Sequence, residues 1–477
     1  MVSPSQRALS VRSAVYVLGQ VLSKGLSFVL VPLFTRRLTQ GDYGLLAICT
    51  ALMAGLQPLL SLGLPSALAR FFALAADSGE RRRLVGSLSW ATGALVLVGG
   101  IAVEAVTLTI GSGQLFGVPW NPALRLAIWG ALLATGAALP VALVQMEERT
   151  AAYALLTYGQ PVLRLLLSVV LVAFLQRGLL GVLEAIVLSY VLFLPIYAWI
   201  LVRAGAARLD WGVLGRCLVF CLPLVPHNMA HWILNLSDRL VIQPFVTSAD
   251  LGLYALAFQV AQIVLLAGMS INDALMPFLL NRAWDPEAPS LFSQVSRLFA
   301  FGIGGLTVVV AASAVPLVGL LAPPAYAPAA RLVAPMAAGY LFLALYYVPR
   351  HFLFLAGRSG VIALCSAGAA AVNIMWNLLL TPRLGIGAAA WGTCVSYLLL
   401  WAAVTVLARD HMIGRLERRD LVAVLGGAAS AVAVSAFFVP RGLGMAFTLP
   451  LLAGGGVGLA LVVAGRRHVP AESRLRR

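Results

Sequence analysis

The sequence predicts an all-α polytopic membrane protein with about 14 transmembrane helices. Apolar residues make up 61% of its 477 residues, charged residues make up only 10%, and the mean hydropathy is +0.95. Soluble domains carry about 25% charged residues, so this composition excludes a water-soluble fold. Many apolar runs also reach the length of about 20 residues that a membrane-spanning helix needs, and the segments between them are short.

A window of about 19 residues places the individual spans. We expect the first one to be a retained span, because it continues past 20 residues without the small-residue cleavage pattern of a signal peptide. The expected spans are 13–35, 43–66, 85–111, 122–146, 151–175, 179–203, 213–237, 251–280, 298–321, 328–356, 359–381, 386–408, 420–439 and 443–465.

Basic residues gather on one side of these spans. Most of the 33 lysines and arginines fall in the segments on the side of the N-terminus. The positive-inside rule therefore predicts that both termini are cytoplasmic, as an even number of spans requires. The basic tail "GRRHVPAESRLRR" suits anionic lipid headgroups, so we expect membrane lipids and no nucleic acid as partners.

Several function classes are disfavoured by what the chain contains. Lys24, the only lysine, is not part of a G-x-x-x-x-G-K-[ST] loop, and the five cysteines lack the spacing of a zinc site. We expect no cofactor and no metal. A membrane glycosyltransferase would need acidic catalytic residues, but Glu147 and Glu148 stand beside Arg149 as in an ordinary loop. A transporter is the expected class, not an enzyme.

A short motif recurs along the chain and indicates an internal duplication. At a constant offset of 208 positions, T-x-x-D-x-G gives the pairs Thr39 and Thr247, Asp42 and Asp250, and Gly44 and Gly252. Both copies start on the same side of the membrane, which is typical of parallel repeats around a substrate site near the midplane. We predict two pseudo-symmetric six-helix bundles, 1–208 and 209–410, around a central polar cavity. Residues 411–477 then hold two additional C-terminal helices and a basic cytoplasmic tail.

Polar side chains follow helical spacing inside several spans. Exposure of such groups to lipid is costly, so we expect them to face a cavity or a neighbouring helix. Interhelical hydrogen bonds of about 0.6 kcal/mol each explain the amides and hydroxyls equally well, and a helix kinked by nearby prolines is the favoured explanation of the two histidines. The candidates for cavity lining are Gln20, Ser27, Gln57, Gln160, His227, His231, Asn235, Gln259, Gln262, Asn373 and Asn377.

Two cations lie near the middle of their spans, Lys24 in the first and Arg164 in the fifth. A cation at the bilayer centre costs at least about 2.5–3.5 kcal/mol, and no acidic residue lies at a similar depth in either span. We predict that both bind an anionic substrate in the cavity, with solvated or structural placement as the alternative. Arg70 and Arg350 near the cytoplasmic side are candidates for the cavity entrance, although they also fit a topology role.

Three segments carry a resemblance to a known family: "PLFTRRLTQGDYG" followed by "SLGLPSALARFF", "LSDRLVIQPFVTSADLGLYALA", and "AVNIMWNLLLTPRLGIGAAAWGTCVSY". They resemble the polysaccharide flippases (the O-antigen or Wzx-type family) of the multidrug/oligosaccharidyl-lipid/polysaccharide exporter superfamily. The resemblance implies a bacterial inner-membrane protein. It would move an undecaprenyl-pyrophosphate-linked oligosaccharide to the outer leaflet by alternating access, with other polysaccharide assembly proteins as partners.

Two other transporters of the superfamily remain open. A lipid II flippase would have similar helices, a cationic cavity and two additional spans. A multidrug antiporter would need a membrane-embedded carboxylate to exchange Na⁺ or H⁺ for a cationic drug. The deep charges of the first half are positive, which argues against the antiporter.

Overall fold

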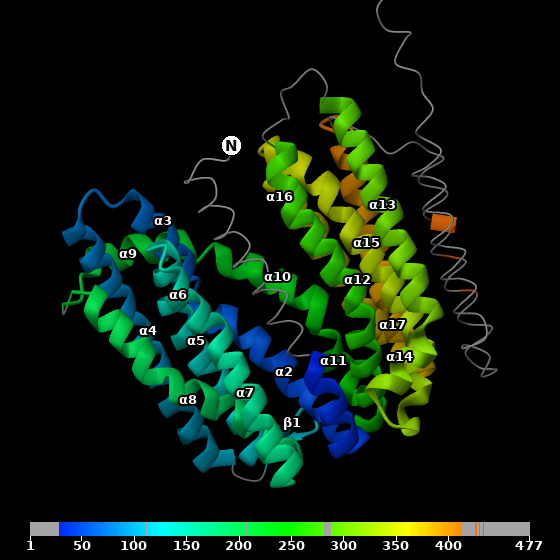
Figure 1. The fold of residues 1–477 in the computed structure, drawn as a ribbon, viewed down its shortest axis with the longest axis horizontal. Helices are drawn as coiled ribbons and strands as arrows, with labels where there is room; N and C mark the ends of the chain where they lie inside the picture. Colours follow the sequence, from blue (N-terminus) through cyan, green and yellow to red (C-terminus); the bar gives the residue numbers. More distant parts are fainter. Residues whose placement is uncertain are drawn as a thin grey trace, which may run out of the picture. The chain divides into compact units, whose positions relative to one another are not determined.

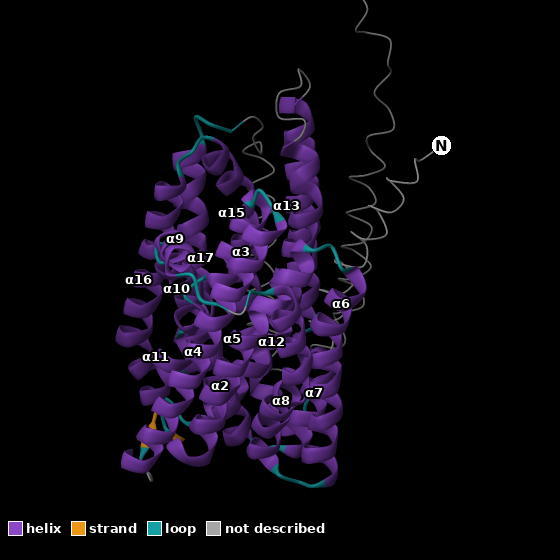
Figure 2. Ribbon diagram, turned by 90° about the vertical axis from the view of Figure 1, so that its left-hand side faces the viewer, coloured by secondary structure: helices purple, strands orange, loops and turns teal. Residues whose placement is uncertain are grey.

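The computed structural model describes residues 28–110, 113–206, 208–280 and 288–412, together with the four positions 425, 426, 429 and 433. In these ranges nearly every residue is helical (Figure 2). The chain divides into two compact units, Met1–Gly252 and Leu253–Arg477. The bundle boundaries 1–208 and 209–410 stay predictions.

Helices make up most of unit 1 (Figure 1). Residues 28–37 are also helical. The elements that follow are α2 (Gln40–Ser61), α3 (Leu64–Leu74), α4 (Ser78–Ile110), β1 (Gln114–Leu115), β2 (Val118–Pro119), π-helix η1 (Trp120–Leu124), α5 (Arg125–Met146), α6 (Thr150–Ala154), π-helix η2 (Leu155–Gly159), α7 (Gln160–Ser168), π-helix η3 (Val169–Phe174), α8 (Gly178–Ala204), α9 (Trp211–Cys221), α10 (Leu224–Leu236), α11 (Asp238–Ile242), 3₁₀-helix η4 (Gln243–Phe245) and the start of α12 (Ser248–Leu280).

Unit 2 continues α12, and the regular elements among its described residues are helical. These are α13 (Ala288–Ala312), α14 (Ala314–Leu321), 3₁₀-helix η5 (Pro324–Ala329), α15 (Ala330–Leu355), α16 (Ser359–Leu384) and α17 (Ile386–Ala408). Helix α15 lies at the centre of this unit and is buried along most of its length. Glycines allow its neighbours to approach closely, because a Cβ on Gly268 of α12 would lie 2.7 Å from the Ala344 Cβ, and one on Gly339 of α15 would lie 3.1 Å from the Cys394 Cα.

The predicted class is confirmed by ten helices in the described ranges that are long and apolar enough to cross a membrane. Ten of the predicted spans correspond to them. Of the other four, 420–439 and 443–465 lie outside the described stretches apart from isolated positions, and 13–35 begins outside them. The fourth, 213–237, is divided between α9 and α10. The count of fourteen therefore stays a prediction.

Two predicted spans are interrupted in unit 1. Span 43–66 ends its first helix at Ser61, because Leu62 and Gly63 adopt left-handed φ angles of 48° and 72° before α3 begins. In span 213–237 the chain turns after Cys221, just before Pro223. The two interruptions meet, since the Cys221 Sγ donates a hydrogen bond to the Gly63 carbonyl at 3.1 Å.

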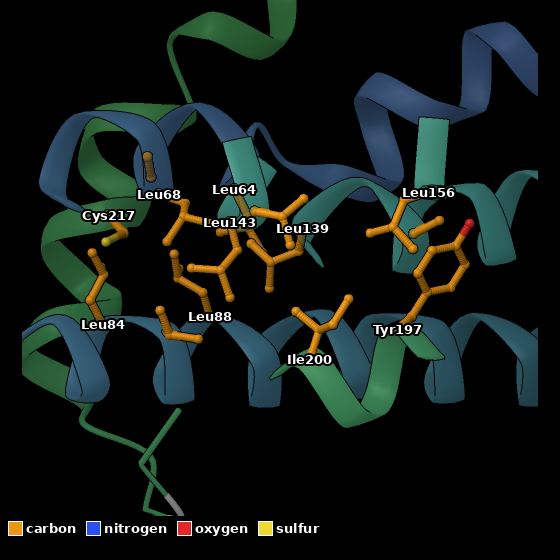
Figure 3. Packing of buried hydrophobic residues seen from close by; sticks show 14 of the residues in the cluster. Leu64, Leu68, Leu84, Leu88, Leu139, Leu143, Leu156, Tyr197, Ile200 and Cys217 are labelled. Carbon is orange, nitrogen blue, oxygen red and sulfur yellow. The ribbon is translucent and has the colours of Figure 1, made fainter. Parts of the chain in front are cut away.

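The apolar core of unit 1 joins α3, α4, α5, α6, η2, α8 and α9, and Figure 3 shows part of its packing. Leu68 of α3, Leu88 of α4 and Leu143 of α5 are fully buried against one another, and α9 contributes Cys217. In lipid, helices gain little from hydrophobic burial and depend on close packing. This interdigitated cluster therefore fixes these elements relative to one another.

The two copies of the repeated motif form matching helix starts. Thr39 caps α2 by accepting a hydrogen bond from the Asp42 backbone N–H at 3.0 Å, and Thr247 accepts the same bond from Asp250 at 3.1 Å. Each threonine hydroxyl also donates to the aspartate of its own copy, at 2.8 and 2.7 Å. These are capping interactions of the Thr-x-x-acid type.

The glycines of the repeat bring these two helix starts into backbone contact. A Cβ on Gly44 would collide with the Ser248 carbonyl oxygen and lie 2.9 Å from the Gly252 nitrogen. A Cβ on Gly252 would collide with the Gln40 carbonyl oxygen. Each copy of T-x-x-D-x-G therefore provides both the cap of its helix and the glycine that admits the other copy.

Candidate functional site

The span that carries Arg164 is irregular on both sides of this residue. It begins as α6, passes through the π-helical turns of η2, becomes α-helical in α7 and ends in the π-helical turns of η3. Pro161 lies at the start of α7, where its missing N–H suits a change of hydrogen-bond pattern. π-Helical turns are rare in proteins as a whole, but those that do occur are often found at functional sites.

A polar stripe on this span turns toward protein. Gln160 is 5% exposed and donates a hydrogen bond from Nε2 to the Ser189 Oγ of α8 at 2.8 Å. The Ser189 hydroxyl in turn donates to the Ile186 carbonyl at 2.7 Å. Ser168, two helical turns from Gln160, is also buried. This geometry agrees with the hydrogen-bonding explanation of Gln160.

Arg164 is the cation of this stripe and is half-buried. It lies between Gln160 and Ser168 in the sequence, and its guanidinium is close enough to Tyr190 of α8 to interact with it electrostatically. Among the described residues it forms no ion pair with an aspartate or glutamate. Its span runs from Thr150 to Phe174, so Arg164 is about 21 Å and 15 Å from the two ends. It is a deep cation without a carboxylate partner in the described ranges.

Two further candidates of unit 1 are accessible. Gln57 of α2 is exposed, and so is Thr50 two turns earlier on the same face, with its hydroxyl donating to the Leu46 carbonyl at 2.9 Å. Arg70 of α3 is exposed as well and lies over the Phe220 ring of α9, 4.4 Å from its centroid. A cation over an aromatic face is held without losing its charge, so Arg70 remains available to an anion.

The candidates of unit 2 differ in their exposure. Gln259 and Gln262 of α12 are half-buried. Asn373 and Asn377 of α16 are fully buried, and the Asn377 Nδ2 donates to the Asn373 Oδ1 at 3.2 Å. The Thr381 hydroxyl extends the series by donating to Asn377 at 3.4 Å. This buried series matches the hydrogen-bonding explanation for the two asparagines.

The second entrance candidate, Arg350 of α15, is half-buried beside two tyrosines. Its guanidinium lies 5.1 Å from the centroid of Tyr347 and 5.8 Å from that of Tyr346. The next residue, His351, makes a hydrogen bond of 3.1 Å between its Nε2 and the Asn272 Oδ1 of α12. Arg350 is therefore part of a polar cluster near one end of α15.

Of the remaining candidates, only Asn235 has a described side chain. Gln20, Lys24 and Ser27 lie outside the described residues, as do the side chains of His227 and His231. Asn235 of α10 is half-buried and has an interaction partner. Within the described ranges, no group of three or more His, Cys, Asp or Glu side chains could hold a metal ion.

Sequence reasoning did not find two pairings of charged residues. Glu104 of α4 forms an ion pair of 2.7 Å with Arg125 of α5, and Asp238 and Arg239 are both buried at the start of α11. Glu104 lies near the end of one predicted span and Arg125 near the start of the next. This position on the same side of the membrane is the only signal that could have suggested the first pair. Nothing in the residue pattern indicated that Asp238 and Arg239 are buried.

A family model described as "Polysaccharide biosynthesis protein" matches residues 12–281, more than half of the chain. The chain belongs to the polysaccharide biosynthesis protein family. The match covers the span of Arg164, the repeated motif and the first entrance candidate Arg70. This membership agrees with the family resemblance that the sequence segments indicated.

Two curated relatives of this family member come from Haemophilus influenzae. "Lsg locus putative protein 1" is 25% identical over 274 residues, which are 56% of this chain and 64% of the relative. An "Uncharacterized membrane protein" is 23% identical over 278 residues, 57% of this chain and 65% of the relative. The match thus spans somewhat less than two thirds of each relative.

Solved structures show which fold the family member has. "Lipid II flippase MurJ, inward closed conformation" matches 95% of this chain and 99% of its own, with a TM-score of 0.68 and 9% identity. An "Inward-facing conformation of a multidrug resistance MATE family transporter of the MOP superfamily" matches 81% of this chain and 94% of its own, with a TM-score of 0.64 and 13% identity. The chain is a multi-pass membrane protein with the fold of this superfamily.

Proposed function

We propose that this protein is a flippase that moves an undecaprenyl-pyrophosphate-linked oligosaccharide from the inner to the outer leaflet of the bacterial cytoplasmic membrane. Membership of the polysaccharide biosynthesis family supports the class of cargo. The fold shared with a flippase and a transporter supports translocation. The single observation on which the proposal depends is Arg164, a half-buried cation deep in its span without a carboxylate partner among the described residues.

The chemistry of a pyrophosphate matches this cation. A guanidinium presents a rigid fork of donors that binds phosphate oxygens in pairs, and it stays charged even where water is scarce. A hydrogen bond to a charged group contributes about 1.5–3 kcal/mol. Binding the pyrophosphate at Arg164 would offset part of the cost of carrying negative charge into the membrane.

The membrane potential favours the proposed direction. Each elementary charge that crosses a potential of 100 mV is worth about 2.3 kcal/mol. Two negative charges that leave an inside-negative cell therefore release about 4–5 kcal/mol. A cation in the pathway then lowers the barrier, while the field supplies the net drive. Lys24, in the predicted first span, would act in the same way.

Charge variants of Arg164 test this role. Surface polysaccharide would be quantified in cells that depend on this protein, with membrane levels of each variant measured by immunoblot. Arg164→Lys should keep most of the transport, whereas Arg164→Gln should lower it about 10- to 100-fold, because 1.4 kcal/mol corresponds to a factor of ten. The control is Arg331→Gln, which removes an exposed arginine at the start of α15. Full transport by Arg164→Gln at an equal protein level would contradict the proposal.

A lipid II flippase is the second candidate function. The likeness to the lipid II flippase MurJ extends over 95% of this chain, compared with 81% for the MATE transporter. Both cargoes carry a pyrophosphate, so Arg164 does not distinguish them. Depletion of the protein would distinguish the two cargoes. Accumulation of lipid II, with polysaccharide intermediates at their normal level, would favour the second candidate.

A further inference from the structure

A long apolar groove on the side of unit 1 lies outside the candidate site described above. It has a volume of about 730 Å³ and runs between α4, α5 and α8. These three helices contact one another and lie side by side in Figure 1. On α4 its lining extends from Ser89 to Leu108, twenty residues that span about 28 Å.

Glycines hollow this groove, and large apolar side chains border it. A Cβ on Gly93 would meet nothing within 4 Å, and one on Gly136 would meet only Val96 at 3.6 Å. Leu97 and Ile101 are 64% and 61% exposed along the same stretch of α4. In a membrane, such a hollow is filled by a hydrocarbon chain, because an unfilled space forfeits dispersion contacts.

One charged group lies in the lining near its Leu108 end. Glu104 lines the groove, and its Oε1 accepts hydrogen bonds from the Arg125 Nε at 3.0 Å and the Trp129 Nε1 at 2.8 Å, while its Oε2 pairs with the Arg125 Nη2 at 2.7 Å. The Arg125 Nη1 makes no such contact within the described ranges, and both charged side chains are about two-fifths exposed. Glu104 Oε2, which has a single contact, can therefore accept a further hydrogen bond from a ligand, and Arg125 Nη1 can donate one.

The depth of this pair matches a lipid headgroup. Arg83, in the basic cluster at the start of α4, precedes Glu104 by 21 residues, which is about 31 Å or one hydrocarbon thickness. Glu104 thus lies at the opposite interface, the outer one in the predicted topology. From Glu104 to Gly93 the groove covers about 16 Å, the depth of a single leaflet.

We propose that this groove binds one acyl chain of a zwitterionic aminophospholipid, whose phosphate lies at Arg125 and whose ammonium lies at Glu104. Charge complementarity selects this ligand. The Glu104–Arg125 pair is neutral overall and presents both signs, as does a headgroup with one phosphate and one primary amine. A purely anionic headgroup would gain at Arg125 but would be repelled by Glu104.

The test is native mass spectrometry of the purified full chain, taken from mixed micelles with equal phosphatidylethanolamine and phosphatidylglycerol. The wild type should retain one phosphatidylethanolamine in preference to phosphatidylglycerol, by about tenfold. Gly93→Leu and Gly136→Leu fill the groove and should abolish that retention. Gly368→Leu is the matched control, because a Cβ on Gly368 of α16 also meets nothing within 4 Å but lies outside the groove. It should retain the lipid like the wild type.

A second pair of variants tests the headgroup contacts. Glu104→Gln removes the negative charge and should shift the preference toward phosphatidylglycerol, while the bound lipid remains one per chain. Equal retention by Gly93→Leu and Gly368→Leu would overturn the site, and equal binding of both lipids by the wild type would overturn the headgroup assignment. Melting temperatures equal to that of the wild type would show that the leucine variants remain folded.

Discussion

Replacing Gly44 by alanine should destabilise unit 1 far more than the same change at Gly41, three residues earlier in α2. The added Cβ at Gly44 would collide with the Ser248 carbonyl oxygen and lie 2.9 Å from the Gly252 nitrogen. These atoms belong to the backbone of α12, so they cannot rotate away as a flexible side chain would. The two helix starts must separate by about 1 Å to restore ordinary contact.

The cost follows from packing and helix propensity. Overpacking of this kind typically costs about 1–3 kcal/mol of folding free energy. We expect the upper half of that range, because the added Cβ can be accommodated only by a shift of the backbone. Alanine gains at most about 1 kcal/mol in helix propensity, and both variants share this gain. At Gly41 the added Cβ would meet the Ser248 Cβ at 3.7 Å and the Thr39 Oγ1 at 3.8 Å, which are ordinary contacts. The two variants should therefore differ by about 2–3 kcal/mol.

Thermal unfolding of the purified protein in detergent would measure this difference. One kcal/mol corresponds to about 2–4 °C for a unit of this size, so Gly44→Ala should melt about 4–12 °C below Gly41→Ala. Gly252→Ala should behave like Gly44→Ala, since its Cβ would collide with the Gln40 carbonyl oxygen. The double variant should lose less than the sum, because the separation that accommodates one Cβ also accommodates the other. Melting of Gly44→Ala within about 1 °C of Gly41→Ala would refute the reasoning.

Gln160→Leu should lower stability by only about 0.6 kcal/mol and leave transport unchanged, because Gln160 is buried against Ser189, whose hydroxyl keeps its own bond to the Ile186 carbonyl. Melting curves measure the change in stability, and polysaccharide export measures transport. Loss of export at unchanged stability would indicate that Gln160 lines the cavity. Among the five cysteines, Cys365 should react first with a maleimide in the folded protein, because it is half-buried whereas the other four are buried. Peptide mass spectrometry after brief labelling checks this order, and earlier modification of Cys49 would contradict the packing of α2.

Hydropathy predicted the spans well where helices are continuous. The predicted range 386–408 coincides with α17, and 179–203 lies within one residue of α8 at each end. The break at Leu62 and Gly63 was not predicted. A leucine is as apolar as the rest of the span, so hydropathy does not reveal that its φ angle is left-handed. The break near Pro223 did have such a signal, since proline disfavours helical continuation.

The sequence indicates which residue types could line a site but not the environment of each side chain. Gln160 and Arg164 lie one turn apart and share a helical face, and both approach α8, Gln160 at Ser189 and Arg164 at Tyr190. Spacing alone could not show that Asn377 is fully buried against Asn373, because burial depends on which neighbouring helix covers the face. The motif glycines were recognised as a repeat, but their backbone contact depends on three-dimensional packing.

The central claim is that this protein moves a lipid-linked oligosaccharide across the membrane. Mass spectrometry of lipid extracts from cells that lack it tests this claim most directly. We expect undecaprenyl-pyrophosphate-linked oligosaccharides to accumulate, and the intact protein to reverse the accumulation while the Arg164→Gln variant does not. Unchanged levels of these intermediates, together with new sensitivity of the cells to cationic dyes, would contradict the claim and indicate a drug exporter.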